Sequence, residues 1–176
     1  KKLVDRMHGT IEVKSKQGEG SIFIVTIPCR KASEENALVK KDTHLQNHGC
    51  LKGSRILLAE DNEINAEVAT ELLKEEGCIV EVANDGVACI DMIEKADAGY
   101  YKMILMDIQM PVMNGYDATI AIRNLNNPKK ARIPIIAMTA NAFAEDAKKA
   151  LSAGMNDHVA KPIDMNILVP AMMKYL

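Results

Sequence analysis

Five polar side chains come directly after short apolar stretches of the chain: Glu60, Asp61, Asp107, Thr139 and Lys161. Short apolar stretches that end at polar or chain-breaking residues are typical of buried strands. If such strands are parallel, their carboxyl ends meet at one edge of a sheet, where open α/β folds place their ligands. An isolated aspartate at such a position is ordinarily a solvated loop residue. The repetition at successive strand ends instead predicts one shared site.

The chemistry of this site follows from its charges. Carboxylates about 5 Å apart repel by roughly 3 kcal/mol per pair at an effective dielectric of about 20, so three of them require a cation. Hard oxygen ligands suit Mg²⁺, or the similar Mn²⁺, and such an ion often bridges to a phosphate. Lys161 adds a fixed positive charge and Thr139 a hydroxyl donor. These groups together indicate phosphoryl transfer to Asp107 as the nucleophile.

A regular alternation of strands and helices positions these residues. We expect strands at residues 55–59, 79–83, 103–106, 133–138 and 157–160, and helices at 65–76, 85–96, 116–124, 143–153 and 163–175. On the first of these helices, Val68, Leu72 and Leu73 are expected to face the core. Five strands alternating with five helices imply an α/β fold, with a doubly wound parallel sheet covered on both faces by right-handed crossovers.

The first 53 residues follow a different pattern. Residues 10–15 and 21–27 flank a glycine-containing turn and indicate a β-hairpin, preceded by a short helix at 1–7. Because an isolated hairpin is only marginally stable in water, we interpret residues 1–28 as the end of a larger domain. Residues 29–53 are polar with mixed charges, which is typical of a linker. We place the second domain at residues 54–176.

Composition argues against several classes of protein. The net charge of −2 favours neither nucleic acid nor an anionic membrane, and 3% aromatic content without Trp argues against stacking on single-stranded nucleic acid. No stretch has the length of a membrane span or the pattern of a signal peptide. The four cysteines form no CxxC pair. We therefore expect a cytoplasmic location without membrane contact by these residues, while a membrane anchor in a longer parent protein stays open.

Residues 54–176 resemble the receiver domain of two-component response regulators. The matching segments are Ile56-Leu-Leu-Ala-Glu-Asp-Asn62, Leu105-Met-Asp-Ile-Gln-Met-Pro111, Asn114-Gly115, Ala137-Met-Thr-Ala-Asn141 and Gly154-Met-Asn-Asp-His-Val-Ala-Lys-Pro162. The resemblance implies a flavodoxin-like five-stranded parallel sheet with strand order 2-1-3-4-5. It also implies a cis peptide bond between Lys161 and Pro162.

The resemblance also implies roles for individual residues. Asp107 would be the phosphoacceptor. Glu60, Asp61 and Asp107 would hold Mg²⁺ or Mn²⁺ together with the backbone carbonyl of Gln109. Thr139 and Lys161 would contact the phosphoryl group.

Two positions bear on switching. The family commonly carries Tyr or Phe three residues before the lysine, and this sequence has His158 there. In the family, movement of the threonine is coupled to an inward turn of that ring, so Thr139 and His158 are the expected switch pair, with the coupling through His158 left open. Gln109 stands two residues after the acceptor, where side chains tune hydrolysis of the acyl phosphate.

The N-terminal segment carries a second resemblance. Residues 2–15 and 18–23 are similar to the final helix and hairpin of a histidine-kinase ATP-binding domain. This implies a bacterial hybrid histidine kinase as the parent protein. The helix with the phosphorylated histidine and the nucleotide site are not in this sequence, and His8 lies in a turn, so we expect no ATP-dependent kinase activity from it.

The predicted function is that of a phosphorelay receiver acting as a signalling switch. The donor would be a phosphohistidine, either in its own kinase or on a histidine phosphotransfer protein. The fourth helix, fifth strand and last helix would form the partner surface, and a homodimer through the hairpin is a further hypothesis. Two alternatives stay open. The first is an aspartyl-nucleophile phosphatase, although the haloacid-dehalogenase pattern requires a second Asp at the position of Gln109. The second is an interaction-only pseudo-receiver, against which the complete set of acidic residues argues.

Overall fold

Five short segments form one parallel sheet in the computed structural model: β3 (Arg55–Ala59), β4 (Ile79–Ala83), β5 (Met103–Asp107), β6 (Ile135–Thr139) and β7 (Asp157–Ala160). Their order in the sheet is β4-β3-β5-β6-β7, which confirms the expected 2-1-3-4-5 arrangement. Ala59 pairs with Met106, and Asp107 pairs with Met138. The strand ends that carry polar residues therefore lie along one edge of the sheet.

The structure describes residues 4–5, 8–16, 18, 20–28, 51–139 and 144–176. By its internal contacts the chain divides into two compact units, Lys1–Thr43 and His44–Leu176. Most of the expected linker, residues 29–50, lies outside the described residues. Leu51 belongs to the second unit, because it is fully buried in that unit's core although the sequence placed the boundary at Ser54.

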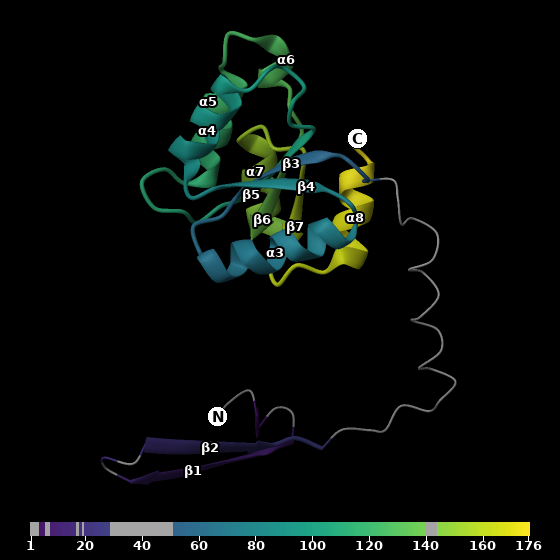
Figure 1. Ribbon diagram of the computed structural model, residues 1–176. Coiled ribbons are helices and arrows are strands. Elements are labelled where there is room, and N and C mark those ends of the chain that lie inside the picture. The colour runs from purple at the N-terminus through teal and green to yellow at the C-terminus, as the bar shows by residue number, and fades with distance from the viewer. Residues whose placement is uncertain (1–3, 6–7, 17, 19, 29–50, 140–143) are drawn as a thin grey trace. The chain divides into compact units, whose positions relative to one another are not determined.

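Helices cover both faces of the parallel sheet: α3 (Glu63–Glu75), α4 (Gly86–Lys95), α5 (Gly115–Arg123), α6 (Pro128–Ala131), α7 (Ala144–Ser152) and α8 (Met165–Met173). Figure 1 shows α3 and α8 on one face, with α4 and α5 on the other. Side chains alternate along each strand, so Leu105 packs in the core with α3 and α8, while Ile104 and Met106 pack in the core with α4 and α5. No helix in the described ranges is both long and apolar enough to cross a bilayer.

Asn and Asp side chains begin the helices that follow the strands. The Asn62 side chain accepts a hydrogen bond from the Asn65 backbone N–H, which starts α3, and Asp85 and Asn114 do the same for α4 and α5. These residues satisfy backbone donors that have no partner inside the helix. These three side chains therefore start the helices that follow β3, β4 and β5.

Besides helix ends that shift by one or two residues, four details differ from the sequence predictions. Asp107 is the last residue of β5 rather than the residue after it. Strand β6 begins at Ile135, because Pro134 has no N–H to donate to the sheet. The short helix α6 was missed, since its four residues look like a loop. Val68 is 54% exposed, because the inward stripe of α3 is Ala66, Ala69 and Leu73.

Arg123, at the end of α5, bonds to two other segments of the chain. Its Nε donates to the Gly154 carbonyl at 2.8 Å, and its Nη1 donates to the Ala131 and Ile133 carbonyls, both at 2.8 Å. Its Nη2 donates to Asn156 Oδ1 at 2.9 Å. One half-buried side chain therefore connects the end of α5 to the segment before β6 and to the segment before β7.

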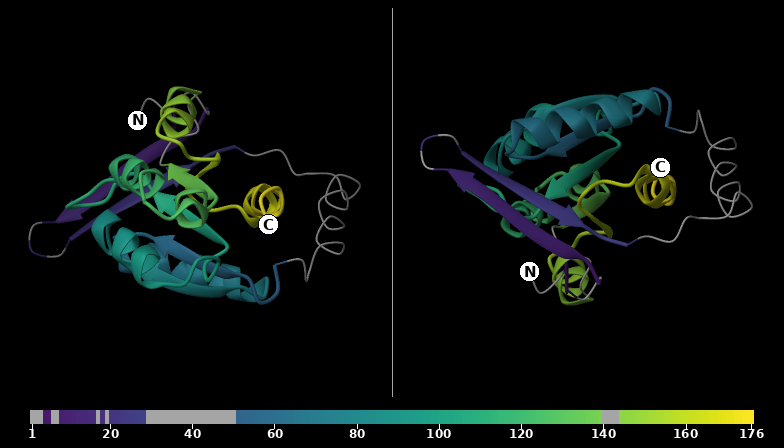
Figure 2. Two further views of the ribbon diagram at one scale, coloured as in Figure 1. Left: turned by 90° about the horizontal axis from the view of Figure 1, so that it is seen from above. Right: turned by 90° about the horizontal axis from the view of Figure 1, so that it is seen from below.

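The first unit is an antiparallel hairpin of β1 (Thr10–Lys16) and β2 (Gly20–Thr26), drawn as two adjacent arrows in Figure 2. Val13 pairs with Phe23, and Ile11 pairs with Val25. Because paired residues point to the same side, these four apolar side chains share one face. Phe23 is 67% exposed, and no described residue of this unit is buried. Of the helix expected at residues 1–7, only residues 4–5 are described, and they are helical.

Candidate functional site

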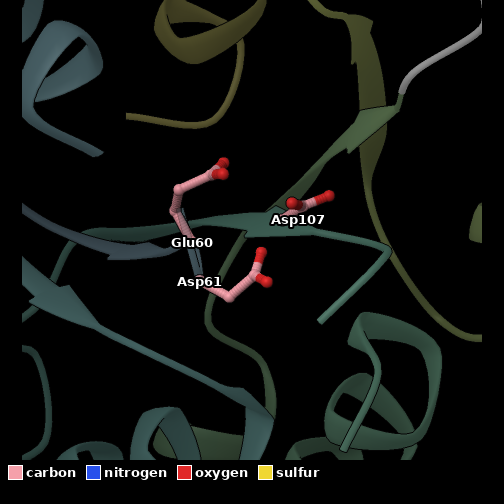
Figure 3. A group of neighbouring side chains, drawn as sticks. All are labelled: Glu60, Asp61 and Asp107. Atoms are coloured by element: carbon pink, nitrogen blue, oxygen red, sulfur yellow. The ribbon is translucent and has the colours of Figure 1, made fainter. Parts of the chain in front are cut away.

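Three carboxylates meet at the carboxyl edge of the parallel sheet. Glu60 and Asp61 directly follow β3, and Asp107 ends the neighbouring strand β5. One oxygen from each carboxylate lies within 4.8 Å of the other two. Figure 3 shows the three side chains around a common space. Glu60 and Asp107 are buried, at 3% and 6% exposure, whereas Asp61 is exposed.

Lys161 bridges the two buried carboxylates. Its Nζ lies 2.5 Å from Glu60 Oε2 and 2.6 Å from Asp107 Oδ2. Burial lowers the pKa of Lys161, but its hydrogen bonds and its charge interactions with Asp107 and Glu60 raise it more, so this pKa lies above its ordinary value of 10.5. The ammonium is therefore a permanent charge at neutral pH. Asn65 Nδ2 holds the other Glu60 oxygen, Oε1, at 3.0 Å.

Asp107 is also fixed by the loop that follows it. The Gln109 backbone N–H donates to Asp107 Oδ1 at 3.1 Å, and the Gly115 N–H donates to the Ile108 carbonyl at 3.0 Å. A Cβ atom at Gly115 would lie only 2.2 Å from the Asp107 carbonyl oxygen. Only glycine therefore allows the start of α5 to pack this closely against the acceptor strand.

The same loop contains a strained residue. Val112 has a φ of 63°, and the Met113 N–H donates to the Pro111 carbonyl at 2.6 Å. A hydrogen bond between residues two apart around a residue of positive φ defines a γ-turn, which is a rare and strained form. The Val112 side chain is 86% exposed, so no packing accounts for this conformation.

The switch candidates lie on the neighbouring strands. Thr139 is 3% exposed at the end of β6, and its carbonyl accepts the Lys161 backbone N–H at 2.7 Å. His158 pairs with Ala137 in the sheet, so its side chain lies on the same face as that of Thr139 but farther from the edge. The His158 side chain is 35% exposed, with Nδ1 3.9 Å from Asp157 Oδ1. The peptide bond between Lys161 and Pro162 is cis, as the sequence resemblance implied.

The carboxylate cluster fits a small divalent cation. The donors are hard carboxylate oxygens that lie within 4.8 Å of one another, which is the type of ligand that Mg²⁺ prefers. Three negative charges and the one positive charge of Lys161 leave a net charge of −2, which a divalent cation neutralises. These residues therefore fit Mg²⁺, which would supply positive charge for phosphoryl oxygens.

Two contributors to the site were not predicted from sequence. The Asn65 side chain orients Glu60. Gly115, which has no Cβ, allows the end of β5 to pack against the start of α5. The signal for Gly115 is its place directly after the capping residue Asn114, where a helix starts against a strand end.

Comparison with known proteins gives a consistent result. Residues 56–173 match the model of the response regulator receiver domain family. The hybrid signal transduction histidine kinase B of Dictyostelium discoideum is 42% identical over 135 residues, covering 71% of this chain and 7% of that protein. The aerobic respiration control sensor protein ArcB of Escherichia coli is 34% identical over 175 residues, covering 99% of this chain. This chain spans only 21% of ArcB.

Solved structures agree with these sequence matches. The receiver domain of a sensor histidine kinase from Pseudomonas aeruginosa, with a magnesium ion in its active-site cleft, is 40% identical with a TM-score of 0.62, covering 70% of this chain and 97% of that one. The receiver of the histidine kinase CKI1 from Arabidopsis thaliana, with Mg²⁺ and BeF₃⁻, is 30% identical with a TM-score of 0.62, covering 73% and 94%. A chain in the complex of Saccharomyces cerevisiae Ypd1, a histidine phosphotransfer protein, with the Ssk1 receiver domain is 26% identical with a TM-score of 0.63, covering 71% and 90%.

Proposed function

This chain belongs to the response regulator receiver domain family, and we propose that its Asp107 accepts a phosphoryl group from a phosphohistidine in a two-component phosphorelay. The observation that carries the proposal is the Asp107 carboxylate itself, buried at a strand end, 2.6 Å from a lysine ammonium and inside a three-carboxylate cluster. Glu60, Asp61 and Asp107 would hold Mg²⁺ together with the backbone carbonyl of Gln109.

The reaction needs a nucleophile and stabilisation of charge. An Asp107 oxygen attacks phosphorus, a new P–O bond forms, and the P–N bond to the donor imidazole breaks as its electrons return to the ring nitrogen, which then takes up a proton. Lys161 orients the Asp107 carboxylate before attack and offers its ammonium to a phosphoryl oxygen. Thr139, at the end of the next strand, would offer its hydroxyl to another phosphoryl oxygen. Bound Mg²⁺ would offset the charge of the phosphoryl oxygens.

Phosphorylation would also act as the switch. A phosphoryl group on Asp107 competes with Glu60 for Lys161, whose Nζ lies between these two carboxylates. A change in that balance would shift the population of two arrangements of the β6–β7 edge. Thr139 and His158, which share one face of this edge, are the residues that we expect to respond.

The donor would approach beside α3. A cavity of about 150 Å³ lies between α3 and the segment after β7, with Glu60 and Lys161 in its wall and Val68, Leu72, Pro162 and Ile163 around them. Val68 and Ile64 are 54% and 71% exposed on the same helix. An apolar surface beside the acceptor suits a helical phosphohistidine donor, and the similarity to the receiver bound to Ypd1 supports this type of partner.

We further propose that residues 1–28 end a histidine-kinase ATP-binding domain, joined by the linker 29–53 to the receiver of a hybrid kinase in the cytoplasm. The match to ArcB across 99% of the chain supports this, as does the exposed apolar face of the hairpin. Adding the preceding kinase segment of the parent protein should protect the Phe23 amide from hydrogen exchange. If residues 1–176 alone are dimeric and already protected there, the face belongs to a homodimer instead.

The test of the phosphoacceptor uses the whole chain. A small phosphodonor with Mg²⁺ should add one phosphate, detected by intact mass spectrometry, and chelation of the metal should prevent it. Asp107→Asn should remain unlabelled, and Asp97→Asn, remote from the site, should label normally. Labelling of Asp107→Asn would overturn the assignment. No labelling of the unaltered chain would favour a pseudo-receiver, and multiple turnover of a phosphomonoester would favour a phosphatase.

A further inference from the structure

A second concave site lies at the opposite edge of the sheet from Asp107. A cavity of about 210 Å³ opens beside the amino ends of β5 and β6. Its apolar lining comes from α4, from the turn before β5 and from the segment before β6: Ile93, Ala96, Tyr101, Ile133 and Pro134. Ile93, Tyr101 and Ile133 are buried, so this lining is a fixed part of the core.

Four cations surround this apolar lining. Lys102 lies just before β5, Lys129 and Lys130 lie in α6, and Arg132 follows α6. The only acidic residue that lines the cavity in the described part of the chain is Asp97. Four positive charges and one negative charge give a local charge of +3, although the whole chain has a net charge of −2.

Most of these cations have no counter-charge. Lys102, Lys129 and Arg132 are exposed, and none of them forms an ion pair with a residue that the structure describes. Lys130 is half-buried, and its Nζ donates to the Glu94 carbonyl at 2.8 Å. That bond holds the ammonium in place without neutralising it, and leaves two of its three donors for another acceptor.

The arrangement is suited to an anion with an apolar part. Like charges around one concavity repel each other, and the low-dielectric wall of the cavity focuses their field, so an anion there gains more than it would at a flat surface. Arg132 offers a planar fork that matches phosphate oxygens, and lysines are common phosphate ligands. The volume is below the roughly 300 Å³ at which typical ligand pockets begin, so the occupant is small.

We propose that this cavity, which we call the amino-edge pocket, binds a small phosphate monoester that carries one apolar or aromatic group. The phosphate would contact Lys129, Lys130 and Arg132, and the apolar group would pack on Ile133 and Tyr101. This proposal does not depend on phosphorylation of Asp107. The pocket is nonetheless connected to the acceptor site, because β5 begins at its wall and ends at Asp107.

The test is an NMR titration of the ¹⁵N-labelled chain with phenyl phosphate, in the presence of a chelator so that the carboxylate cluster holds no metal. We expect saturable shifts at the amides of Lys102, Ala131 and Arg132, with a dissociation constant on the order of 1 mM or below. Phenol and inorganic phosphate, tested separately, should each bind at least 10-fold more weakly, because phenol lacks the phosphate and inorganic phosphate lacks the aromatic group.

Matched charge reversals complete the test. Lys129→Glu with Arg132→Glu should weaken phenyl phosphate at least 10-fold. Lys148→Glu with Lys149→Glu reverses two exposed charges on α7 and should leave binding unchanged. Amide spectra of both variants establish that they fold. The proposal is overturned by shifts that do not saturate, by shifts centred on Asp107 and Thr139, by equal binding of inorganic phosphate, or by equal loss in the two variants.

Discussion

The two ends of strands β5 and β6 carry charged groups in opposite states of burial. At the carboxyl ends, Asp107 is 6% exposed and is held by Lys161 at 2.6 Å. At the amino ends, Lys102 and Arg132 are exposed and form no ion pair with any residue in the described ranges. A buried charge needs a partner at a fixed position, whereas exposed charges need only to be near each other to create a potential.

This difference separates two ways of building a site. At the carboxyl edge, the position of each atom matters, because Lys161 bonds to both buried carboxylates, Asn65 bonds to Glu60, and Gly115 packs against the Asp107 backbone carbonyl. At the amino edge, the charges can move by several ångströms without much change in the potential that they create. Substitutions at the first edge should therefore change stability and chemistry together, and substitutions at the second edge should separate them.

Removal of the buried cation should have the largest effect. In Lys161→Met, Glu60 and Asp107 would remain buried without a counter-charge, so we expect the free energy of unfolding to fall by about 3 kcal/mol without divalent metal. Saturating Mg²⁺ should restore part of this loss, because it supplies the missing charge. Phosphorylation by a small donor should slow about 10²-fold. Urea unfolding with and without Mg²⁺ and time-resolved mass spectrometry measure these effects.

The control for this variant is Lys174→Met, which removes an exposed lysine from its pair with Asp157. This substitution should change stability little and phosphorylation not at all. If Lys161→Met behaves in the same way, the carboxyl edge does not depend on the buried ion pair.

The second largest effect is steric. In Gly115→Ala, the added Cβ would overlap the Asp107 carbonyl oxygen, so we expect a loss of about 2–3 kcal/mol and at least 10-fold slower phosphorylation as the acceptor moves. The control is the same substitution at Gly53, which lies before β3. Its φ of +78° would be strained by about 1 kcal/mol, but its Cβ meets no atom within 4 Å, so phosphorylation should be unaffected. Normal phosphorylation of Gly115→Ala would contradict the requirement for close packing.

The third largest effect should be a pH-dependent change in stability at the amino edge of the sheet. The Tyr101 hydroxyl donates to Glu81 Oε2 at 2.7 Å, and this bond contributes most to a Glu81 pKa below its ordinary value of 4.5. A lowered pKa stabilises the folded chain above pH 4.5, and that stabilisation is lost as the pH falls through the lowered value. Tyr101→Phe should therefore cost about 1 kcal/mol at neutral pH, since Glu81 is partly exposed, and progressively less as the pH falls below 4.5.

Unfolding curves at neutral and acid pH provide the measurement for Tyr101→Phe. Its phosphorylation at neutral pH should match that of the unaltered chain, because Tyr101 lies at the far end of β5 from Asp107. A loss of stability that is the same at both pH values would show that the hydroxyl does not act through the Glu81 carboxylate.

The smallest effect should have the opposite sign. Val112→Gly relieves a positive φ that costs a side chain about 1–2 kcal/mol, and part of this gain is offset by the greater freedom of glycine in the unfolded chain. We expect a net stabilisation of about 0.5–1 kcal/mol in thermal unfolding. Val87→Gly, at an exposed position of α4, should instead destabilise by a similar amount. Destabilisation by both changes would indicate that the γ-turn is not strained.

Much of the fold was predictable because the strand signals are strong. The stretches that became β3, β4 and β7 were placed at their observed bounds, and the parallel sheet followed from the alternation with helices, whereas the strand order followed from the resemblance to receiver domains. The rotation of α3 was not predictable from hydrophobicity alone. Small residues, Ala66 and Ala69, face the sheet, and the larger Val68 is left exposed beside the site.

The site was predictable at the level of which residues meet, but not of how they are held. Carboxylates at neighbouring strand ends must converge, so the cluster of Glu60, Asp61 and Asp107 followed from topology. The bridge from Lys161 to both buried carboxylates depends on the path of the chain after β7, which no pattern specifies. The amino-edge pocket was missed for a similar reason, since its cations come from segments without regular periodicity.

The Arg123 side chain has a consequence for how the molecule opens. Asn156 Oδ1 accepts from Arg123 and also from the Ile135 N–H at 2.9 Å, while the Asn156 N–H donates to the Ile135 carbonyl at 2.8 Å. Release of the Ile135 amide therefore disturbs the guanidinium and, through it, the carbonyls of Ala131 and Gly154. In hydrogen exchange, the segments before β6 and β7 should behave as one cooperative opening unit, with a common free energy for amides that are about twenty residues apart.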